Sequence, residues 1–256
     1  MSGVLWRGWV WLVLALVYLP ILALIAMSFN ASRYGTFPFE FTLRWYEALA
    51  ENRRLWEATL RSLWLSLAVA AAAGAIGTMA AVWMSRFGRG GARAMQGLLV
   101  TAITVPWLIL AIAILLAALW VGVGRGLVTL FLGSLVVAMP YAALVVATRL
   151  QGLGPDAELA ARSLGAGPVR AFLLVTLPLI ARAVMSGVML AFVITFNNFP
   201  LHFFLAPFGF NTLPMEIYSY VISGYVPDIN ALSAIILGGA VMLGLAVMGW
   251  RRLRGG

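Results

Sequence analysis

Few side chains in this 256-residue chain have the types and spacing that enzyme chemistry needs. There is one histidine, His202, so a His-Glu-x-x-His metal site cannot be built. The only aspartates, Asp156 and Asp228, lie in predicted loops, which excludes an intramembrane aspartyl protease, and no Gly-x-Ser-x-Gly is present. Lysine is absent, which excludes a P-loop for ATP, and cysteine is absent as well. The sequence therefore predicts no catalytic residue, no metal site and no cofactor.

The composition points to a membrane. Hydrophobic residues make up 63% of the chain and charged residues 10%, against about 25% charged residues in soluble domains. A soluble globule could not cover so much apolar surface, and a disordered protein would be far more polar. The net charge of +9 comes from arginines that separate apolar runs, which is the pattern of membrane topology rather than of nucleic-acid binding. We therefore predict an all-α, polytopic membrane protein.

Six stretches are apolar over the roughly 20 residues that a transmembrane helix requires. They are residues 9–29, 63–84, 97–120, 127–148, 183–205 and 232–250. We interpret the first as a retained helix, because the run is too long for a signal sequence and no cleavage site closes it before Asn30. Residues 30–62 suit an amphipathic interfacial helix, and residues 206–231 suit a turn-rich loop with one short helix near 215–221.

The arginines predict how the spans are oriented. With the N-terminus inside, the cytoplasmic segments carry 11 arginines and two acids, whereas the outer segments have no net charge. Basic residues concentrate on the cytoplasmic side of membrane proteins. Both termini are therefore predicted to be cytoplasmic.

The inner segment from residue 149 to 182 contains a short helix with strong boundary signals. A glycine–proline pair ends the fourth span just before it. Asp156 can cap the new helix, and Glu158 lies in its first turn, where an anion is favourable. Gly165 suits the position just after the helix, where a left-handed conformation is common.

A second helix should follow. Pro168 is suited to its first turn, and Pro178 is predicted to stop or kink it before the fifth span. The small side chains of Ala160 and Ala161 would let a partner approach the first helix closely. On these residues alone, the segment is either a simple helical hairpin or a docking surface, and neither interpretation is favoured.

The run Leu159-Ala-Ala-Arg-Ser-Leu-Gly165, followed after nine residues by Val175-Thr-Leu-Pro178, resembles the Glu-Ala-Ala signature of binding-protein-dependent ABC importer permeases. In that family this helix is the coupling helix, which sits in a groove of the ATP-binding subunit. The family's glutamate position holds Leu159, and Glu158 stands one residue earlier, which turns a helical side chain by about 100°. The resemblance implies an ATPase-coupling role for Asp156, Glu158, Leu159, Ala160, Ala161, Arg162, Ser163, Leu164, Gly165, Ala166 and Gly167.

Four other runs, at residues 25–30, 41–46, 213–218 and 227–232, are similar to the smaller spermidine/putrescine-type permease. The resemblance implies a type-1 ABC permease fold of six helices in a bacterial inner membrane. It also implies four partners, namely a second permease, two ATP-binding subunits and a periplasmic solute-binding protein. The expected divisions are a first helix with a periplasmic segment, a transmembrane domain and a basic cytoplasmic tail, which cover residues 1–60, 61–250 and 251–256.

The fifth span is the most polar one, with Thr195, Asn197 and Asn198 near its outer end. Amides are costly in lipid unless they face a cavity or hydrogen-bond across helices, so they either line a substrate path or join helices. Polyamine permeases that this chain resembles carry acidic residues at this place. The neutral pair makes a less cationic or zwitterionic solute as good a candidate as a polyamine.

The sequence thus predicts a permease subunit of an ATP-driven importer for a small polar solute of the polyamine, opine, aminophosphonate or iron-complex class. The energy would come from ATP hydrolysis by a partner chain. The alternative is a proton- or ion-coupled secondary carrier. Such a carrier would show ionisable residues at membrane depth and two similar halves, and this sequence shows neither.

Overall fold

The computed structural model describes residues 2–32, 37–86, 89–154, 156–224, 230–239 and 242. Within these residues the regular secondary structure is helical, and extended backbone pairs only at an isolated bridge between Asn30 and Phe41. The all-α prediction is therefore confirmed. The chain divides into two compact units, one of Met1–Trp56 with Glu216–Gly256 and one of Glu57–Met215.

In the first unit, α1 (Ser2–Met27) is apolar and long enough to cross a membrane, which confirms the first predicted span. Pro20 lies inside α1 without breaking it. The turn after α1 is bonded to α2 (Arg44–Glu51), because the indole N–H of Trp45 donates to the carbonyl of Asn30 at 2.8 Å. Helix α2 is the amphipathic helix predicted after the first span.

Two helices of the C-terminal part are described. Helix α11 (Leu213–Ser223) corresponds to the short helix predicted in the outer loop. An apolar helix over Asn230–Gly239 begins the sixth predicted span, whose other residues except 242 lie outside the described ones, as does the tail 251–256. The described residues contain four helices long and apolar enough to cross a membrane, or five if one bent pair forms a single span. The count of six stays a prediction.

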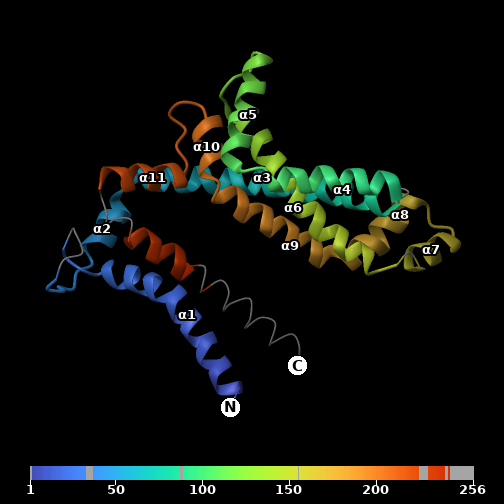
Figure 1. The fold of residues 1–256 in the computed structure, drawn as a ribbon. Helices are drawn as coiled ribbons and strands as arrows, with labels where there is room; N and C mark the ends of the chain where they lie inside the picture. The colour runs from blue at the N-terminus through green and yellow to red at the C-terminus, as the bar shows by residue number, and fades with distance from the viewer. Residues whose placement is uncertain are drawn as a thin grey trace. The chain divides into compact units, whose positions relative to one another are not determined.

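The second unit is built on three long helices. Helices α3 (Arg53–Arg86) and α6 (Leu127–Gln151) confirm the second and fourth predicted spans. The third is a continuous helix over Pro168–Phe196. It comprises α8 (Pro168–Ala171), the wider π turn η1 (Phe172–Thr176) and α9 (Leu177–Phe196). Helix α6 packs along α9 and against α3, and these faces enclose the hydrophobic core (Figure 1).

The third predicted span, 97–120, is not one continuous helix. It consists of α4 (Arg89–Thr104) and α5 (Trp107–Trp120), which meet at an angle of 106°. Pro106 stands at the break. A proline has no backbone N–H and disfavours helical conformation in the residue before it, so a break here is physically reasonable. Figure 1 shows α5 turning away from the layer of α4 and α6.

The fifth predicted span, 183–205, also differs from the structure. The helix begins earlier, at Pro168, and ends at Phe196. Asn197 and Asn198 interrupt it, and a separate short helix α10 (Phe199–Leu205) follows and packs against α5 and α6.

Pro178 was predicted to stop or kink the preceding helix, and the first of these outcomes is wrong, because the helix runs through Pro178. Pro178 lies in the first turn of α9, directly after η1, where Leu177 N–H bonds to the carbonyl of Phe172 five residues earlier. A proline ring crowds the carbonyl four residues before it. The wider π turn lets the chain pass this point without ending the helix.

Candidate functional site

The short cytoplasmic-side helix predicted from the sequence is present as α7 (Asp156–Ser163). Asp156 is its first helical residue rather than its cap, and the residue before it lies outside the described ones. At its other end Gly165 adopts φ of +91° and donates its N–H to the Arg162 carbonyl at 3.0 Å. Ala166 N–H donates to the Ala161 carbonyl at 3.1 Å, which completes a Schellman motif. The predicted role of Gly165 in ending the helix is therefore confirmed.

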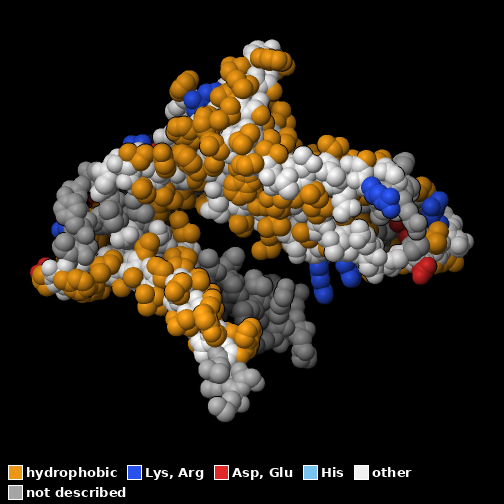
Figure 2. Space-filling model, viewed as in Figure 1, with side chains coloured by type: hydrophobic (Ala, Val, Ile, Leu, Met, Phe, Trp, Pro, Cys, Tyr) orange, Lys and Arg blue, Asp and Glu red, His pale blue; other side chains and the backbone are white. Residues whose placement is uncertain are grey.

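Helix α7 presents apolar side chains to solvent. None of its residues is buried, Leu159 is 51% exposed, and Leu164 just after the helix is 89% exposed. An isolated exposed leucine is ordinary, but Leu164 follows a helix that has no buried residue, and together they leave a surface that a partner could cover. In the view of Figure 2, charged side chains gather at the end of the second unit that holds α7 and α8, and hydrophobic side chains cover α5.

Glu158 points the other way, toward the body of the second unit. Its Oε1 and Oε2 accept from Nη2 of Arg86 at 2.8 and 3.0 Å, and Oε2 also accepts from Oγ1 of Thr176 at 2.7 Å. Arg86 is the last residue of α3, and Thr176 is the last residue of η1. Sequence reasoning missed both partners, because 72 residues separate Arg86 from Glu158 and nothing in the local pattern joins them.

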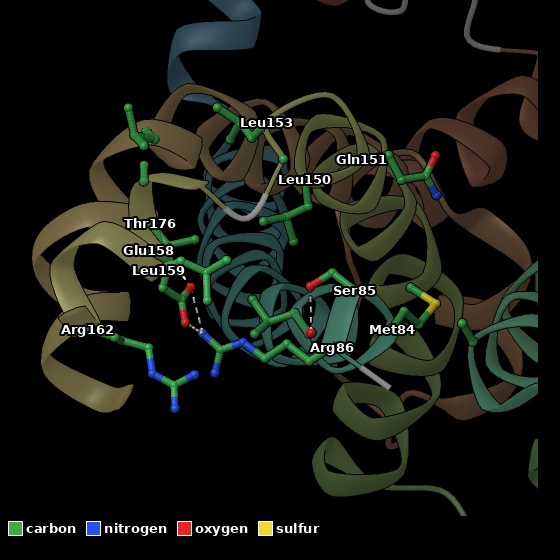
Figure 3. Close-up of a pocket in the computed structure, with 15 residues that line it drawn as sticks. Met84, Ser85, Arg86, Leu150, Gln151, Leu153, Glu158, Leu159, Arg162 and Thr176 are labelled. Atoms are coloured by element: carbon green, nitrogen blue, oxygen red, sulfur yellow. Dashed lines mark hydrogen bonds and ion pairs between the residues drawn. The ribbon is translucent and has the colours of Figure 1, made fainter. Parts of the chain in front are cut away.

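These groups border a cavity of about 740 Å³ between the ends of α3 and α6 and the inner side of α7. Figure 3 shows Arg86, Glu158 and Thr176 directed toward one another on its wall, with Arg162 beside them. Ser85 and Gln151 contribute further polar groups.

The three predicted substrate-path residues have different environments. Asn198 is 2% exposed, and its side-chain oxygen caps α10 by accepting from Leu201 N–H at 3.1 Å. Asn197 is exposed, and its amide donates to the carbonyl of Val193 in its own helix at 3.0 Å. Thr195 is buried, and its hydroxyl has no hydrogen-bond partner among the described residues. The hydrogen bonds that the structure shows for the side chains of Asn197 and Asn198 both go to backbone groups three or four residues away, so neither bridges to a helix distant in sequence.

His202 is the single histidine of the chain. It lies in α10, it is fully buried, and its Nδ1 is 2.9 Å from Oγ1 of Thr212. In the first unit, Arg54 and Glu216 form an ion pair at 2.8 Å. The contact between His202 and Thr212 lies within the second unit, and the ion pair between Arg54 and Glu216 lies within the first.

The comparison with known families covers most of the second unit and beyond. Residues 73–254 match the family described as "Binding-protein-dependent transport system inner membrane component".

Curated relatives match over nearly the whole chain. It is 35% identical to the putrescine transport system permease protein PotI of Escherichia coli (strain K12), over 89% of this chain and 84% of the relative. It is 32% identical to the spermidine/putrescine transport system permease protein PotC of the same strain, over 93% and 90%. PotC of Haemophilus influenzae is 31% identical, over 90% of each chain.

Two solved structures share the fold. A bacterial ABC transporter involved in the import of the acidic polysaccharide alginate superposes with a TM-score of 0.73, at 12% identity and over 97% of this chain and 96% of that one. An amino acid ABC transporter superposes with a TM-score of 0.56, at 15% identity and over 83% and 99%. Together, the matched residues, the relatives and the fold show that this chain belongs to the family of inner membrane components of binding-protein-dependent ABC transport systems.

Proposed function

We propose that this chain couples ATP hydrolysis by partner subunits to the import of a small polar solute, with α7 as the coupling helix. The observation that carries the proposal is the exposure of α7, which has no buried residue and includes the half-exposed Leu159, and of Leu164 just after it. A groove on an ATP-binding subunit would cover these side chains. Closure of the ATPase dimer would then move the permease between inward- and outward-facing states.

The full assembly would contain this chain, a second permease, two ATP-binding subunits and a periplasmic solute-binding protein. The excess of arginine in the segments before and after α7 supports a cytoplasmic position for α7 and for both termini in a bacterial inner membrane. The transmembrane domain would span residues 61–250. The third to fifth spans would line the solute path, and two of them carry the breaks at Pro106 and at Asn197 and Asn198.

The relatives are named for putrescine and spermidine, which favours a polyamine for this chain. Asn197, exposed at the helix break, offers a neutral amide where a polycation would favour carboxylates. A zwitterionic or less cationic solute is therefore the competing candidate for the same importer.

ATPase activity of the reconstituted assembly tests the function. The complex, with its binding protein, is assayed against polyamines, opines, aminophosphonates and ferric iron. Stimulation by one class supports the importer and identifies the solute. Solute uptake by this chain without any ATP-binding subunit would overturn the proposal and favour a secondary carrier.

The role of α7 is tested by L164D, which places a charge on the proposed contact surface. The matched control is V121D, an equally drastic change at an exposed residue in the turn after α5. We expect L164D to lose the ATP-binding subunits on purification and V121D to retain them. Retention by both variants would contradict the coupling role.

A further inference from the structure

The inner side of α7 is attached through a carboxylate rather than through a hydrophobic core. Of the helix residues, only Glu158 and Ala161 are partly sheltered, and they lie three residues apart, so they share the inner face. Ala161 has a single methyl group to bury. The Glu158 side chain is 21% exposed and makes three polar contacts, all to other elements of the second unit.

The pair between Glu158 and Arg86 joins two helix ends of opposite polarity. Arg86 ends α3, where a cation is favourable, and Glu158 lies in the first turn of α7, where an anion is favourable. Each charge is therefore suited to its own helix as well as to its partner. A charge-assisted hydrogen bond that is partly sheltered from water is stronger than a fully exposed surface pair.

The side chains of Glu158 and Arg86 also contact both ends of the π turn η1. Thr176, its last residue, donates to Glu158, and the guanidinium of Arg86 lies 5.7 Å from the ring centre of Phe172, its first residue. Isolated π turns are rare and often mark functional sites. Glu158 thus connects α7 to the end of α3 and to the turn that leads into α9 (Figure 3).

We infer that Glu158 is a positioning residue that transmits movement of α7 to α3 and α9 through Arg86 and Thr176. The inference rests on the proposed function, because it takes α7 as the coupling helix. Without these contacts, a displacement of α7 by an ATP-binding subunit would pass less directly to α3 and α9. With the carboxylate in place, the ends of two spans move together with α7.

The test uses the complete transporter in proteoliposomes and measures solute transported per ATP hydrolysed. The variants are E158R, R86E and the charge swap R86E/E158R. Each single change places two like charges next to each other. We therefore expect the number of solute molecules transported per ATP to fall about tenfold, which is comparable to the loss of a charged hydrogen bond. The swap restores opposite charges, and Thr176 can accept from a guanidinium as readily as it donates to a carboxylate. We expect it to recover most of the ratio.

A second pair of variants covers the case in which the single charge changes prevent assembly. T176V removes only the hydroxyl, and T176S keeps it. We expect T176V to lower the ratio about threefold and T176S to leave it unchanged, since one neutral hydrogen bond is at stake. The control E57Q disrupts the 3.5 Å pair between Glu57 and Arg61 at the other end of α3 and should not alter the ratio.

The outcomes separate the two proposals. If L164D releases the ATP-binding subunits while E158R and T176V keep normal transport per ATP, the positioning role of Glu158 is wrong and the coupling helix stands. If L164D retains them, the proposed function itself fails. A charge swap no better than its assembled single variants also overturns the positioning role.

Discussion

Gly77 of α3 lies so close to Ala143 of α6 that a Cβ at position 77 would stand 2.9 Å from the backbone nitrogen of Ala143. A Cβ at Gly187 of α9 would stand 3.1 Å from Cα of Ala142, and Cβ of the same alanine would lie 3.2 Å from a Cβ at Gly77. Glycines from two different helices thus approach the same pair of alanines on α6. Small residues let membrane helices approach closely and gain packing that larger side chains would prevent.

The first prediction concerns this packing. G77A should destabilise the permease by about 1–3 kcal/mol, because the new methyl group meets backbone that can move only if α3 and α6 separate. Thermal unfolding of the purified complex in detergent measures the effect. The control is G97A in α4, where an added Cβ meets nothing within 4 Å. Equal melting of the two variants would argue against close packing of α3 on α6.

A second prediction concerns the end of α7. G165P should abolish transport and leave membrane insertion intact. Proline cannot adopt φ of +91° and lacks the N–H that bonds to the Arg162 carbonyl. Uptake into vesicles and membrane fractionation are the two measurements. G167A is the matched control, since the backbone at Gly167 is extended with φ of −64° and an added Cβ has open space.

A third prediction concerns the inner face of α7. A161D adds a carboxylate one turn after Glu158, where it competes for Arg86 and repels its neighbour. We expect transport to be lost while the protein still inserts into the membrane. A161S, which is small and uncharged, should transport normally. Normal uptake by A161D would mean that this face of α7 does not contribute to coupling.

The two asparagines give a fourth prediction, because the structure assigns them different tasks. N198A should destabilise the protein by about 1 kcal/mol, since it removes the cap of α10, whereas N198S keeps an uncharged accepting oxygen at the cap and most of the stability. N197D should leave melting unchanged and shift solute preference toward cations. Melting temperature and the ATPase response to cationic and zwitterionic solutes distinguish these effects. A stability loss at 197 and none at 198 would reverse the assignment.

Four prolines within or near predicted spans have different effects on their helices, which the sequence alone does not predict. Pro20 and Pro140 lie inside the unbroken helices α1 and α6, Pro178 lies where the helix continues through a π turn, and Pro106 stands at a bend of 106°. The local sequence effect is the same in each case, namely a missing N–H and a crowded carbonyl. Whether the helix survives depends on the neighbouring helices that satisfy the freed groups.

The interruption of the helix at Asn197 and Asn198 could not be predicted from the sequence for a similar reason. The apolar residues on both sides of Asn197 and Asn198 predict one continuous span to residue 205. The side chain of Asn198 instead caps a new helix, and α10 gains burial against α5 and α6. That gain depends on where α5 lies after its own bend.

The sequence by itself determined the properties that depend on local chemistry. The length of apolar runs predicted α1, α3 and α6, and the glycine at 165 predicted where α7 ends, because a left-handed residue there is a property of the backbone alone. The tertiary structure alone decided what Glu158 does. Its partners, Arg86 and Thr176, come from two other elements, and only the packing of helices brings side chains so distant in sequence within 3 Å.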